Sequence, residues 1–297
     1  MMKQVVTVHI LFTLLVLSIS GCISPLSNSN TITVALDGSG DYTSIQEAID
    51  SAPENATITV KEGTYQEHVY INKSIILQGV NAQTTIIDGN QTEDTIYIDA
   101  GGRATITGFT IRNSGSDYNS PTHDAGVEIT TNNNIIDDNI IEYNYIGIYS
   151  REALNNTISN NTIHSNDQYG IYMYTNSNGF ILRKNVFENN NYALRIKGSR
   201  ENIIVENAFQ QNSQGLYFCC GATNNFVYLN SFVNNSIWNA NDYLMGNHWD
   251  NGEEGNYWSD YTGIDTDADG IGDTPYNITT DGYKKDLYPL IDPIQLS

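Results

Sequence analysis

Basic residues are scarce in this chain. Its 297 residues include 13 lysines and arginines against 34 aspartates and glutamates, which gives a formal net charge of -21. Nucleic acid and anionic membrane surfaces would repel such a protein, so we exclude both as partners. Hydrophobic residues make up 39% of the chain, which suffices for a core, and the length allows one large elongated domain or two ordinary ones.

Long apolar runs and cysteines are also few. An apolar run from Val5 to Ile19 follows Lys3 and is too short for a comfortable membrane span, which is typical of a signal peptide. It leads into SISGC, residues 18–22, which resembles the lipobox of bacterial and archaeal lipoproteins. The resemblance implies lipidation at Cys22 and a protein held through that anchor on the extracellular or periplasmic side of the membrane. An ordinary signal peptide with a coincidental cysteine is the alternative.

The other two cysteines, Cys219 and Cys220, are adjacent. Neighbouring residues of a strand point to opposite faces, so these two are poorly placed for a disulfide with each other. We expect one wall residue and one surface thiol, with a soft-metal site as the alternative.

Apolar stripes with the 3.6-residue period of a helix are absent, which excludes a stack of helices. A repeat of about 22 residues takes their place. Its copies read IDDNIIEYN, ISNNTIHSN, LRKNVFENN, IVENAFQQN and VYLNSFVNN, beginning at Ile136, Ile158, Leu182, Ile204 and Val227. Short alternating segments such as GIYS and GIYM lie between them, and such segments, separated by Asn and Gly turns, are typical of strands.

Rungs of this length can close into a coil and stack about 4.8 Å apart, which buries an apolar face that one rung could not bury alone. The sequence therefore predicts an all-β fold, a right-handed parallel β-helix. Asparagines at fixed places in the repeat would lie above one another, where their amides can hydrogen bond along the stack. The two expected ladders are Asn139, Asn161, Asn185, Asn207 and Asn230, and Asn144, Asn166, Asn190, Asn212 and Asn235.

An open stack exposes strand edges at both ends, so it needs caps. The stretch YTSIQEAIDSAP predicts a short amphipathic helix at the N-terminal end, with Ser44 and Glu47 in a capping box. We expect a lipoprotein signal peptide over residues 1–22, a tether over 23–33, an N-terminal cap and first rungs over 34–80, β-helix repeats over 81–245, and a C-terminal cap with an acidic loop over 246–297.

Two stretches resemble known families. VALDGSGDYTSIQEAIDSAP and GTYQEHVYINKSIILQG, within residues 34–79, resemble the N-terminal cap shared by pectin methylesterases and many other β-helix proteins. The repeats together with GNYWSDYTG, DADGIGDTPY and YPL resemble the NosD-type family of β-helix proteins, described as copper-binding. This second resemblance covers nearly all of the mature chain, and it implies copper as a cofactor. The QDTL-, DFIFG- and GRPW-like catalytic motifs of pectin methylesterases are absent, so we do not expect that activity.

The acidic loop DTDADGIGD, which begins at Asp265, is similar to the start of an EF-hand calcium loop. Carboxylates alternate along it, although the twelfth position is Tyr276 rather than the usual Glu. Carboxylates so close together would repel each other without a cation, so we expect structural calcium, with a solvated acidic turn as the alternative. The expected ligands are Asp265, Asp267, Asp269, the Ile271 carbonyl and Asp273.

The strand phase that contains GIYS predicts an outward-facing stripe, because alternation sends Val127, Ile148, Ile171, Leu194, Leu216 and Ile237 inward. Aromatic rings offer flat faces to sugar rings, and arginines pair with carboxylates or sulfates. The alternative is that tyrosine is simply a good strand residue. The predicted solvent-facing glycan-binding residues are Glu128, Tyr149, Tyr172, Arg195, Tyr217 and Trp238, with Arg151, Tyr174 and Lys197 beside them.

The segment RNSGSDYNSPTHDAG, residues 112–126, is an insertion of about nine residues by repeat arithmetic. Long loops on repeat scaffolds often form a binding wall. Its Asp117, His123 and Asp124 are read either as parts of a decorated loop or as an acid/base group of a glycosidase.

We therefore expect a monomeric surface protein that binds a polysaccharide or glycan and is not an enzyme. A polysaccharide hydrolase or lyase is one alternative, and a copper-handling accessory protein of the NosD type is the other.

Overall fold

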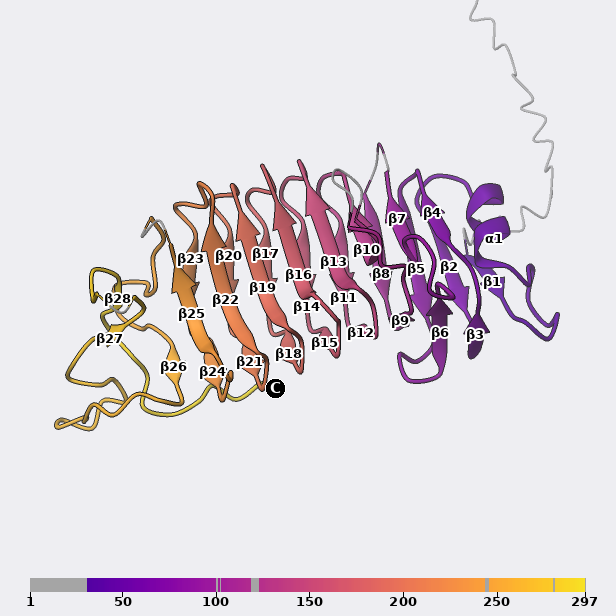
Figure 1. The fold of residues 1–297 in the computed structure, drawn as a ribbon. Coiled ribbons are helices and arrows are strands. Elements are labelled where there is room, and N and C mark those ends of the chain that lie inside the picture. The colour runs from indigo at the N-terminus through magenta and orange to yellow at the C-terminus, as the bar shows by residue number, and fades with distance from the viewer. Residues whose placement is uncertain are drawn as a thin grey trace, which may run out of the picture.

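The computed structural model describes residues 31–99, 101, 103–118, 123–243, 246–279 and 281–296. Within them the chain winds into a stack of rungs that form three parallel sheets (Figure 1). The predicted right-handed parallel β-helix is confirmed. The predicted lipidation site Cys22 lies outside the described residues. No helix in the described part of the chain is long and apolar enough to cross a membrane.

Each full rung adds one strand to each of three sheets, which we name sheets A, B and C. Sheet A contains β1 (Thr31–Val34), β2 (Ala56–Val60), β5 (Ile75–Gly79), β8 (Ala104–Thr107), β11 (Ile135–Asp137), β14 (Thr157–Ser159), β17 (Ile181–Arg183), β20 (Ile203–Val205) and β23 (Phe226–Tyr228). Sheet B contains β3 (Gly63–Tyr65), β6 (Thr85–Asp88), β9 (Thr110–Arg112), β12 (Ile140–Glu142), β15 (Thr162–His164), β18 (Val186–Glu188), β21 (Ala208–Gln210), β24 (Ser231–Val233) and β26 (Tyr257–Trp258). Sheet C contains β4 (Val69–Ile71), β7 (Ile96–Ile98), β10 (Ala125–Ile129), β13 (Ile146–Arg151), β16 (Tyr169–Tyr174), β19 (Tyr192–Lys197), β22 (Gln214–Cys219) and β25 (Trp238–Asp242).

The apolar position of each repeat builds the core. In sheet A, the second residues of five successive strands pair in register and are fully buried; they are Ile136, Ile158, Leu182, Ile204 and Val227. Burying a side chain of this size contributes about 1.5–3 kcal/mol to folding. Because every rung repeats the pattern, the core runs the length of the stack.

Both predicted asparagine ladders are confirmed. Along the first ladder, each amide nitrogen donates to the amide oxygen of the next rung, for example from Asn161 to Asn185 at 3.0 Å and from Asn185 to Asn207 at 3.0 Å. The residue before each ladder asparagine has a left-handed backbone, as at Lys184 with φ of 55°. A left-handed backbone costs free energy in residues other than glycine. The ladder hydrogen bonds pair the buried polar groups of the same turn and so offset part of that cost.

A third ladder was not predicted. It contains Asn134 and Asn156, then Asn202, Asn225 and Asn247, with Phe180 at the position between the two runs. The Phe180 amide still donates to Asn202, so the backbone register continues through the break.

The helix α1 (Ile45–Ser51) covers the N-terminal end of the stack, as predicted (Figure 1). Ser44 is its N-cap and accepts the amide of Glu47. A residue from a later turn of the chain, Glu67, reinforces this end, because its carboxylate accepts the amides of Ile45 and Gln46. A carboxylate is favourable there because the first amides of a helix lack internal acceptors.

At the C-terminal end, a column of parallel aromatic rings joins the core to the cap. Phe209, Phe232 and Trp258 stack in succession at 4.7 and 4.4 Å between centroids, and Tyr276 follows at 4.2 Å. Tyr276 begins the hairpin of β27 (Tyr276–Asn277) and β28 (Lys285–Asp286). The buried Asp286 carboxylate accepts the Trp258 indole N–H at 2.9 Å, and burial raises the pKa of this carboxyl group to about 6. The cap thus continues the core instead of resting on it.

Candidate binding face on sheet C

The outer side of sheet C carries three rows of side chains that lie in register from rung to rung. The central row is Tyr70, Tyr97, Glu128, Tyr149, Tyr172, Arg195, Tyr217 and Asn241. One flanking row is Arg151, Tyr174, Lys197 and Cys219, and the other is Ile146, Tyr169, Tyr192, Gln214 and Trp238. Sequence reasoning missed Tyr70 and Tyr97, which the alternating segments VYI and IYI could have revealed.

The predicted place of Trp238 was wrong by one row. Leu216 pairs with Ala240 and Tyr217 pairs with Asn241, so Trp238 pairs with Gln214. Ile237, expected inside, is 65% exposed. The Trp238 ring nevertheless contacts the face, at 5.8 Å from the ring of Tyr217 and 6.1 Å from that of Tyr192.

The prediction that Glu128, Tyr149 and Tyr172 face solvent was also wrong. They point away from the core, but they are only 2%, 0% and 2% exposed. The insertion covers them: the His123 ring lies 4.8 Å from that of Tyr149 and 6.1 Å from that of Tyr172. The exposed Tyr118 stacks on His123 at 4.4 Å. A second, smaller apolar cluster therefore forms outside the β-helix, between sheet C and the insertion.

The part of the face nearer the C-terminal cap is more open. Arg195, Tyr217 and Trp238 are partly exposed, as are Tyr174 and Lys197 in the neighbouring rows. The Arg195 guanidinium lies over three tyrosine rings, 5.0 Å from Tyr172 and 5.7 Å from Tyr217. The Lys197 ammonium lies 4.5 Å from the ring centre of Tyr174. Cation–π contacts thus hold both cations at the surface in defined positions.

These two cations have no carboxylate partner within the described part of the chain. There, the ion pairs of arginine join Arg112 to Asp88 and Arg151 to Glu128. Arg195 instead donates to the Tyr169 hydroxyl at 2.5 Å. In a protein with a net charge of -21, these two neighbouring cations therefore form a local patch of positive charge.

The open face ends in a hollow beside the C-terminal cap. The hollow has a volume of about 370 Å³ and is lined by Trp238, Ala240, Asn241, Asp242, Tyr243, Ile278, Thr279 and Asp281. Trp238, the last aromatic residue of the face, also lines the hollow, so the face and the hollow adjoin at this residue.

A pair of carboxyl groups lies at the covered end of the face. Asp94 and Glu128 hydrogen bond to each other, and Glu128 also accepts from Arg151 at 3.2 Å. Burial raises the pKa of both groups, and for Asp94 to about 9. Asp94 also accepts the Ala125 amide at 2.7 Å, which fixes the start of β10. The pair therefore keeps a proton at neutral pH.

Replacing Asp94 with asparagine is expected to stabilise the protein more as the pH rises. The folded pKa of Asp94 lies above its unfolded value of about 3.9, so the folded state binds more protons between these values and loses stability as pH rises toward about 9. An amide keeps a donor and an acceptor but carries no charge. The melting temperature of Asp94→Asn minus that of the wild type should therefore increase from about pH 5 to about pH 9. Glu93→Gln, an exposed neighbour, is the control; parallel curves for Asp94→Asn and wild type would contradict the assignment.

Three buried polar atoms in and around this cluster lack a hydrogen-bond partner: His123 Nδ1, Tyr149 Oη and Arg195 Nε. The described residues contain one further such atom, on Thr85. Buried polar groups are normally paired, and three of the four unpaired ones in the described residues lie at the outer side of sheet C.

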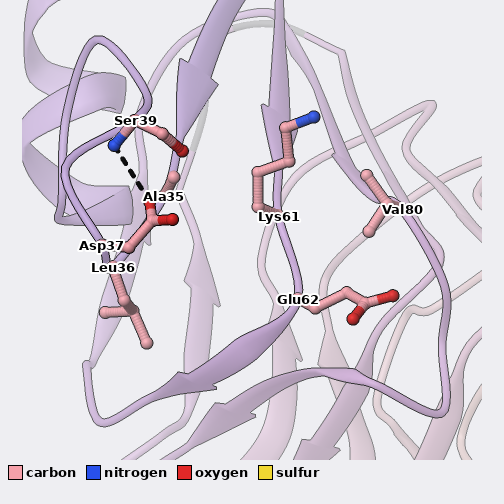
Figure 2. Close-up of a pocket in the computed structure, with 7 residues that line it drawn as sticks. All are labelled: Ala35, Leu36, Asp37, Ser39, Lys61, Glu62 and Val80. Atoms are coloured by element: carbon pink, nitrogen blue, oxygen red, sulfur yellow. Dashed lines mark hydrogen bonds between the residues drawn. The ribbon is translucent and has the colours of Figure 1, made fainter.

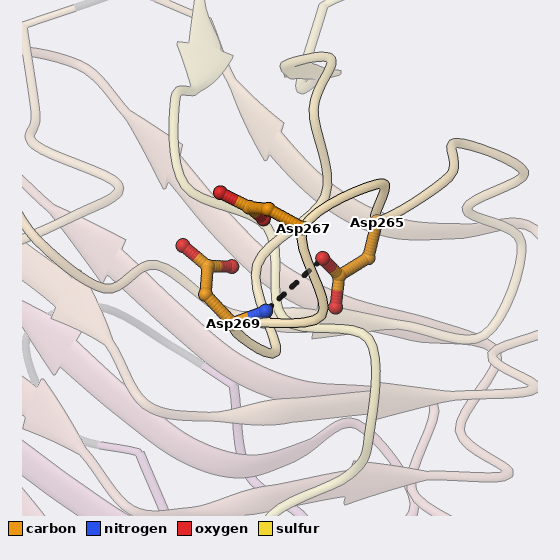
Figure 3. A group of neighbouring side chains, drawn as sticks. All are labelled: Asp265, Asp267 and Asp269. Atoms are coloured by element: carbon orange, nitrogen blue, oxygen red, sulfur yellow. Dashed lines mark hydrogen bonds between the residues drawn. The ribbon is translucent and has the colours of Figure 1, made fainter.

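The acidic loop brings together three of its predicted ligands (Figure 3). Carboxylate oxygens of Asp265, Asp267 and Asp269 lie within 4.8 Å of one another. Asp273 is turned toward Thr266, whose hydroxyl and amide donate to it, and the Ile271 amide donates to Asp269. Asp265 accepts the amides of Asp269 and Gly270, so the loop is ordered by its own hydrogen bonds.

A hollow of about 600 Å³ is lined by residues of the N-terminal rungs (Figure 2). Its walls include Asp37, whose carboxylate accepts the Ser39 amide at 2.9 Å, and Lys61 and Glu62 from the β2–β3 turn. Hydrogen bonds from the Ser39 side chain and from its backbone amide lower the pKa of Asp37. Its lining residues include no aromatic side chain, unlike the face on sheet C.

The fold and this face define a class, the right-handed parallel β-helix with an aromatic face on one sheet. The family model described as "Periplasmic copper-binding protein (NosD)" matches residues 49–263, which is more than half of the chain. The chain therefore belongs to the NosD family.

Other similarities are more limited. A pectinesterase of Petunia integrifolia is 44% identical over 66 residues, which are 20% of this chain and 18% of that protein. The chain thus spans less than a fifth of that relative. Among solved structures, ORF18 of Geobacillus virus E2 has a TM-score of 0.48 at 15% identity, covering 68% of this chain and 54% of the other. A mutant pectin methylesterase in complex with a hexasaccharide has a TM-score of 0.46 at 14% identity, covering 76% of this chain and 77% of the other.

The family description implies copper, and most of the soft donors of this chain do not fit it. His68 bonds to a backbone carbonyl and Thr92, His164 contacts Glu142, and His248 stacks on Phe226. Among the described residues, three or more His, Cys, Asp or Glu side chains come close enough to share a metal ion at the acidic loop alone. That loop offers hard oxygen donors. Copper prefers nitrogen and sulfur, so the adjacent thiols of Cys219 and Cys220 are the donor set that fits its monovalent form.

Proposed function

We propose that this protein is an exported surface protein that binds an acidic polysaccharide along the open part of sheet C. One observation carries the proposal: Arg195 and Lys197 lie over tyrosine rings without a carboxylate partner in the described part of a strongly acidic protein. Aromatic faces suit the apolar sides of sugar rings, and the cations suit carboxylates or sulfates.

The shape of the face supports an extended ligand. Tyr192, Tyr217 and Trp238 lie on consecutive or neighbouring strands, with ring centres 5.8–6.2 Å apart. The face then continues into the hollow beside the cap. A chain of sugars can contact several rungs at once, so weak contacts add along its length.

The proposal is tested by a panel of acidic polysaccharides and neutral ones of similar length. We expect binding to the acidic ones only, with an affinity that falls as salt rises, because exposed charges are screened. Equal binding to neutral polymers, or no binding to any polysaccharide, would refute it.

Cleavage of the polysaccharide is a second candidate function. Two observations favour it. His123 Nδ1 and Tyr149 Oη have no hydrogen-bond partner, and the centres of these two rings lie 4.8 Å apart. Burial lowers the pKa of His123, so its imidazole is neutral and able to accept a proton. The Asp94 and Glu128 carboxyls bond to each other, whereas glycosidases hold theirs at least about 5 Å apart. A proton-abstracting lyase therefore fits better than a hydrolase, and an assay for unsaturated sugar products tests it.

We propose that the acidic loop holds a structural calcium ion through Asp265, Asp267 and Asp269. Chelation with EDTA should lower the melting temperature and added calcium should restore it. Calcium at 100 times its dissociation constant would contribute about 2.7 kcal/mol. Asp267→Asn should abolish the response, while Glu253→Gln, an exposed change in the same cap, should keep it. An unchanged melting curve with EDTA in the wild type would exclude the ion.

We also propose that lipid on Cys22 anchors the protein outside the membrane. The mature protein should partition into detergent and carry the mass of the lipid, and Cys22→Ser should lose both properties.

A further inference from the structure

Some asparagines of this chain begin an Asn-x-Ser/Thr sequence, or sequon, which is the acceptor signal for an N-linked glycan. None of the buried asparagines, those of the ladders included, begins a sequon. The asparagines that do are all exposed; they are Asn55, Asn72, Asn90, Asn155, Asn160, Asn234 and Asn277. The sequon asparagines are therefore a set apart from those that build the ladders.

The turns that hold these asparagines do not require this residue. Asn55, Asn155 and Asn234 have left-handed backbones, with φ of 62°, 56° and 53°. Asparagine tolerates this conformation well. The turn before the third ladder nevertheless has Glu201 in place of Asn155, and the turn before the second has Gln211 in place of Asn234, with φ of 59° and 56°. Backbone geometry alone therefore does not explain an asparagine followed two residues later by a hydroxyl.

Three of the sequons leave both functional groups of the signal free. An acceptor needs a side-chain amide that can react and a hydroxyl that a transferase can recognise. Within the described part of the chain, neither group takes part in a hydrogen bond at these three sites, which are Asn55 with Thr57, Asn155 with Thr157, and Asn234 with Ser236. These sites are ready for modification without any rearrangement of the fold.

At each of the other four sequons, one of the two groups is already engaged. The Asn160 amide nitrogen donates to Asp137 at 2.7 Å. The engaged hydroxyls are Thr92 with the Gly89 carbonyl at 3.3 Å, Ser74 with the Arg103 amide at 3.0 Å, and Thr279 with Asp281 at 2.6 Å. The geometry therefore separates three free sites from four occupied ones.

We propose that Asn55, Asn155 and Asn234 carry N-linked glycans. The inference rests on the proposed export of the chain, because such glycans belong to exported proteins. A lipid-linked sugar phosphate supplies the glycan. The asparagine Nδ2 forms a bond to the anomeric carbon, the bond from that carbon to the phosphate oxygen breaks, and the amide gives one proton to the transferase. Nothing is oxidised or reduced.

The open face of sheet C carries no acceptor of its own. Strands β19 and β22 lie between Asn155 and Asn234 in the chain, and no sequon occurs between Asn160 and Asn234. The proposed glycans extend from turns between sheets, so they add bulk and solubility without replacing any residue of the face.

Peptide mapping by mass spectrometry tests the proposal on the protein purified from its native host. Fragmentation that keeps the glycan attached assigns each added mass to one asparagine. We expect added mass on Asn55, Asn155 and Asn234. Asn224 is the internal control, since it is also exposed and left-handed, with φ of 59°, but is followed two residues later by Phe226. It should be unmodified.

A pair of variants tests whether the hydroxyl selects the acceptor. Thr157→Val removes the hydroxyl but keeps Asn155 and a β-branched strand residue, so the protein should fold and lose the glycan at Asn155 alone. Thr157→Ser retains the signal and should retain the glycan.

Unmodified Asn55, Asn155 and Asn234 in a chain that has lost its signal peptide would overturn this inference and leave export standing. The same result in a chain that keeps residues 1–21 would overturn export as well. A glycan on Asn155 in Thr157→Val, or on Asn224 in the wild type, would show that the signal does not direct the modification.

Discussion

Asn185→Ala is expected to lower the free energy of unfolding by about 3 kcal/mol or more, because it breaks the first asparagine ladder in its middle. Asn185 is fully buried, and its amide oxygen accepts both the backbone amide and the side-chain amide of Asn161, at 3.1 and 3.0 Å. Its amide nitrogen donates to the Ile158 carbonyl at 2.8 Å and to Asn207 at 3.0 Å. Alanine would remove the acceptor of the buried Asn161 backbone amide and the side-chain donor to the Ile158 carbonyl, and a buried polar group left unpaired costs about 1–3 kcal/mol.

Melting temperature at a fixed scan rate measures this effect, and we expect a fall of about 6 °C or more. Asn191→Ala is the matched control, since Asn191 is partly exposed and stands outside the ladder. A variant of Asn185 that melts within a degree or so of this control would show that the ladder contributes little beyond the β-strands.

Replacing Arg195 and Lys197 together with glutamine is expected to weaken binding to the preferred acidic polysaccharide about tenfold or more. Charge-assisted hydrogen bonds contribute about 1.5–3 kcal/mol each, and about 1.4 kcal/mol corresponds to a factor of ten. The loss should shrink at high salt, because screening already weakens the wild-type contacts.

Arg183→Gln with Arg200→Gln is the control for this pair, because it removes the same charge from exposed residues outside the sheet C face. The Arg195 change also removes the contacts of Arg195 to Tyr169 and Cys219. Lys197→Gln alone keeps those contacts, so any loss of affinity in it comes from the Lys197 charge. If the control pair lost as much affinity as the Arg195 and Lys197 pair, the interaction would depend on net charge and not on this face.

The repeat of about 22 residues made the fold predictable, since a fixed spacing places equivalent residues above one another. The two ladders through Asn185 and Asn190 follow from that spacing alone. The third ladder escaped prediction because Phe180 interrupts its pattern. The contact of Glu67 with α1 also escaped, because about 20 residues or more separate the partners and no local pattern marks them.

The binding face was predicted in outline and wrongly in two details. Alternation identified the residues that leave the core, but it says nothing of the path of an insertion. The burial of Tyr149 beneath His123 was therefore invisible in the sequence. In the last rung, Ile237 and Ala240 are both acceptable inward residues, and the chain uses Ala240, three residues further on. The open face consequently lies closer to the C-terminal cap than the sequence indicated.

A crystal structure of the protein with an acidic oligosaccharide tests the central claim most directly. The claim predicts sugar rings against Tyr192, Tyr217 or Trp238, with an anionic group within hydrogen-bond distance of Arg195 or Lys197. An oligosaccharide bound instead on the outer side of sheet A or sheet B, or in the N-terminal hollow around Lys61, would contradict it.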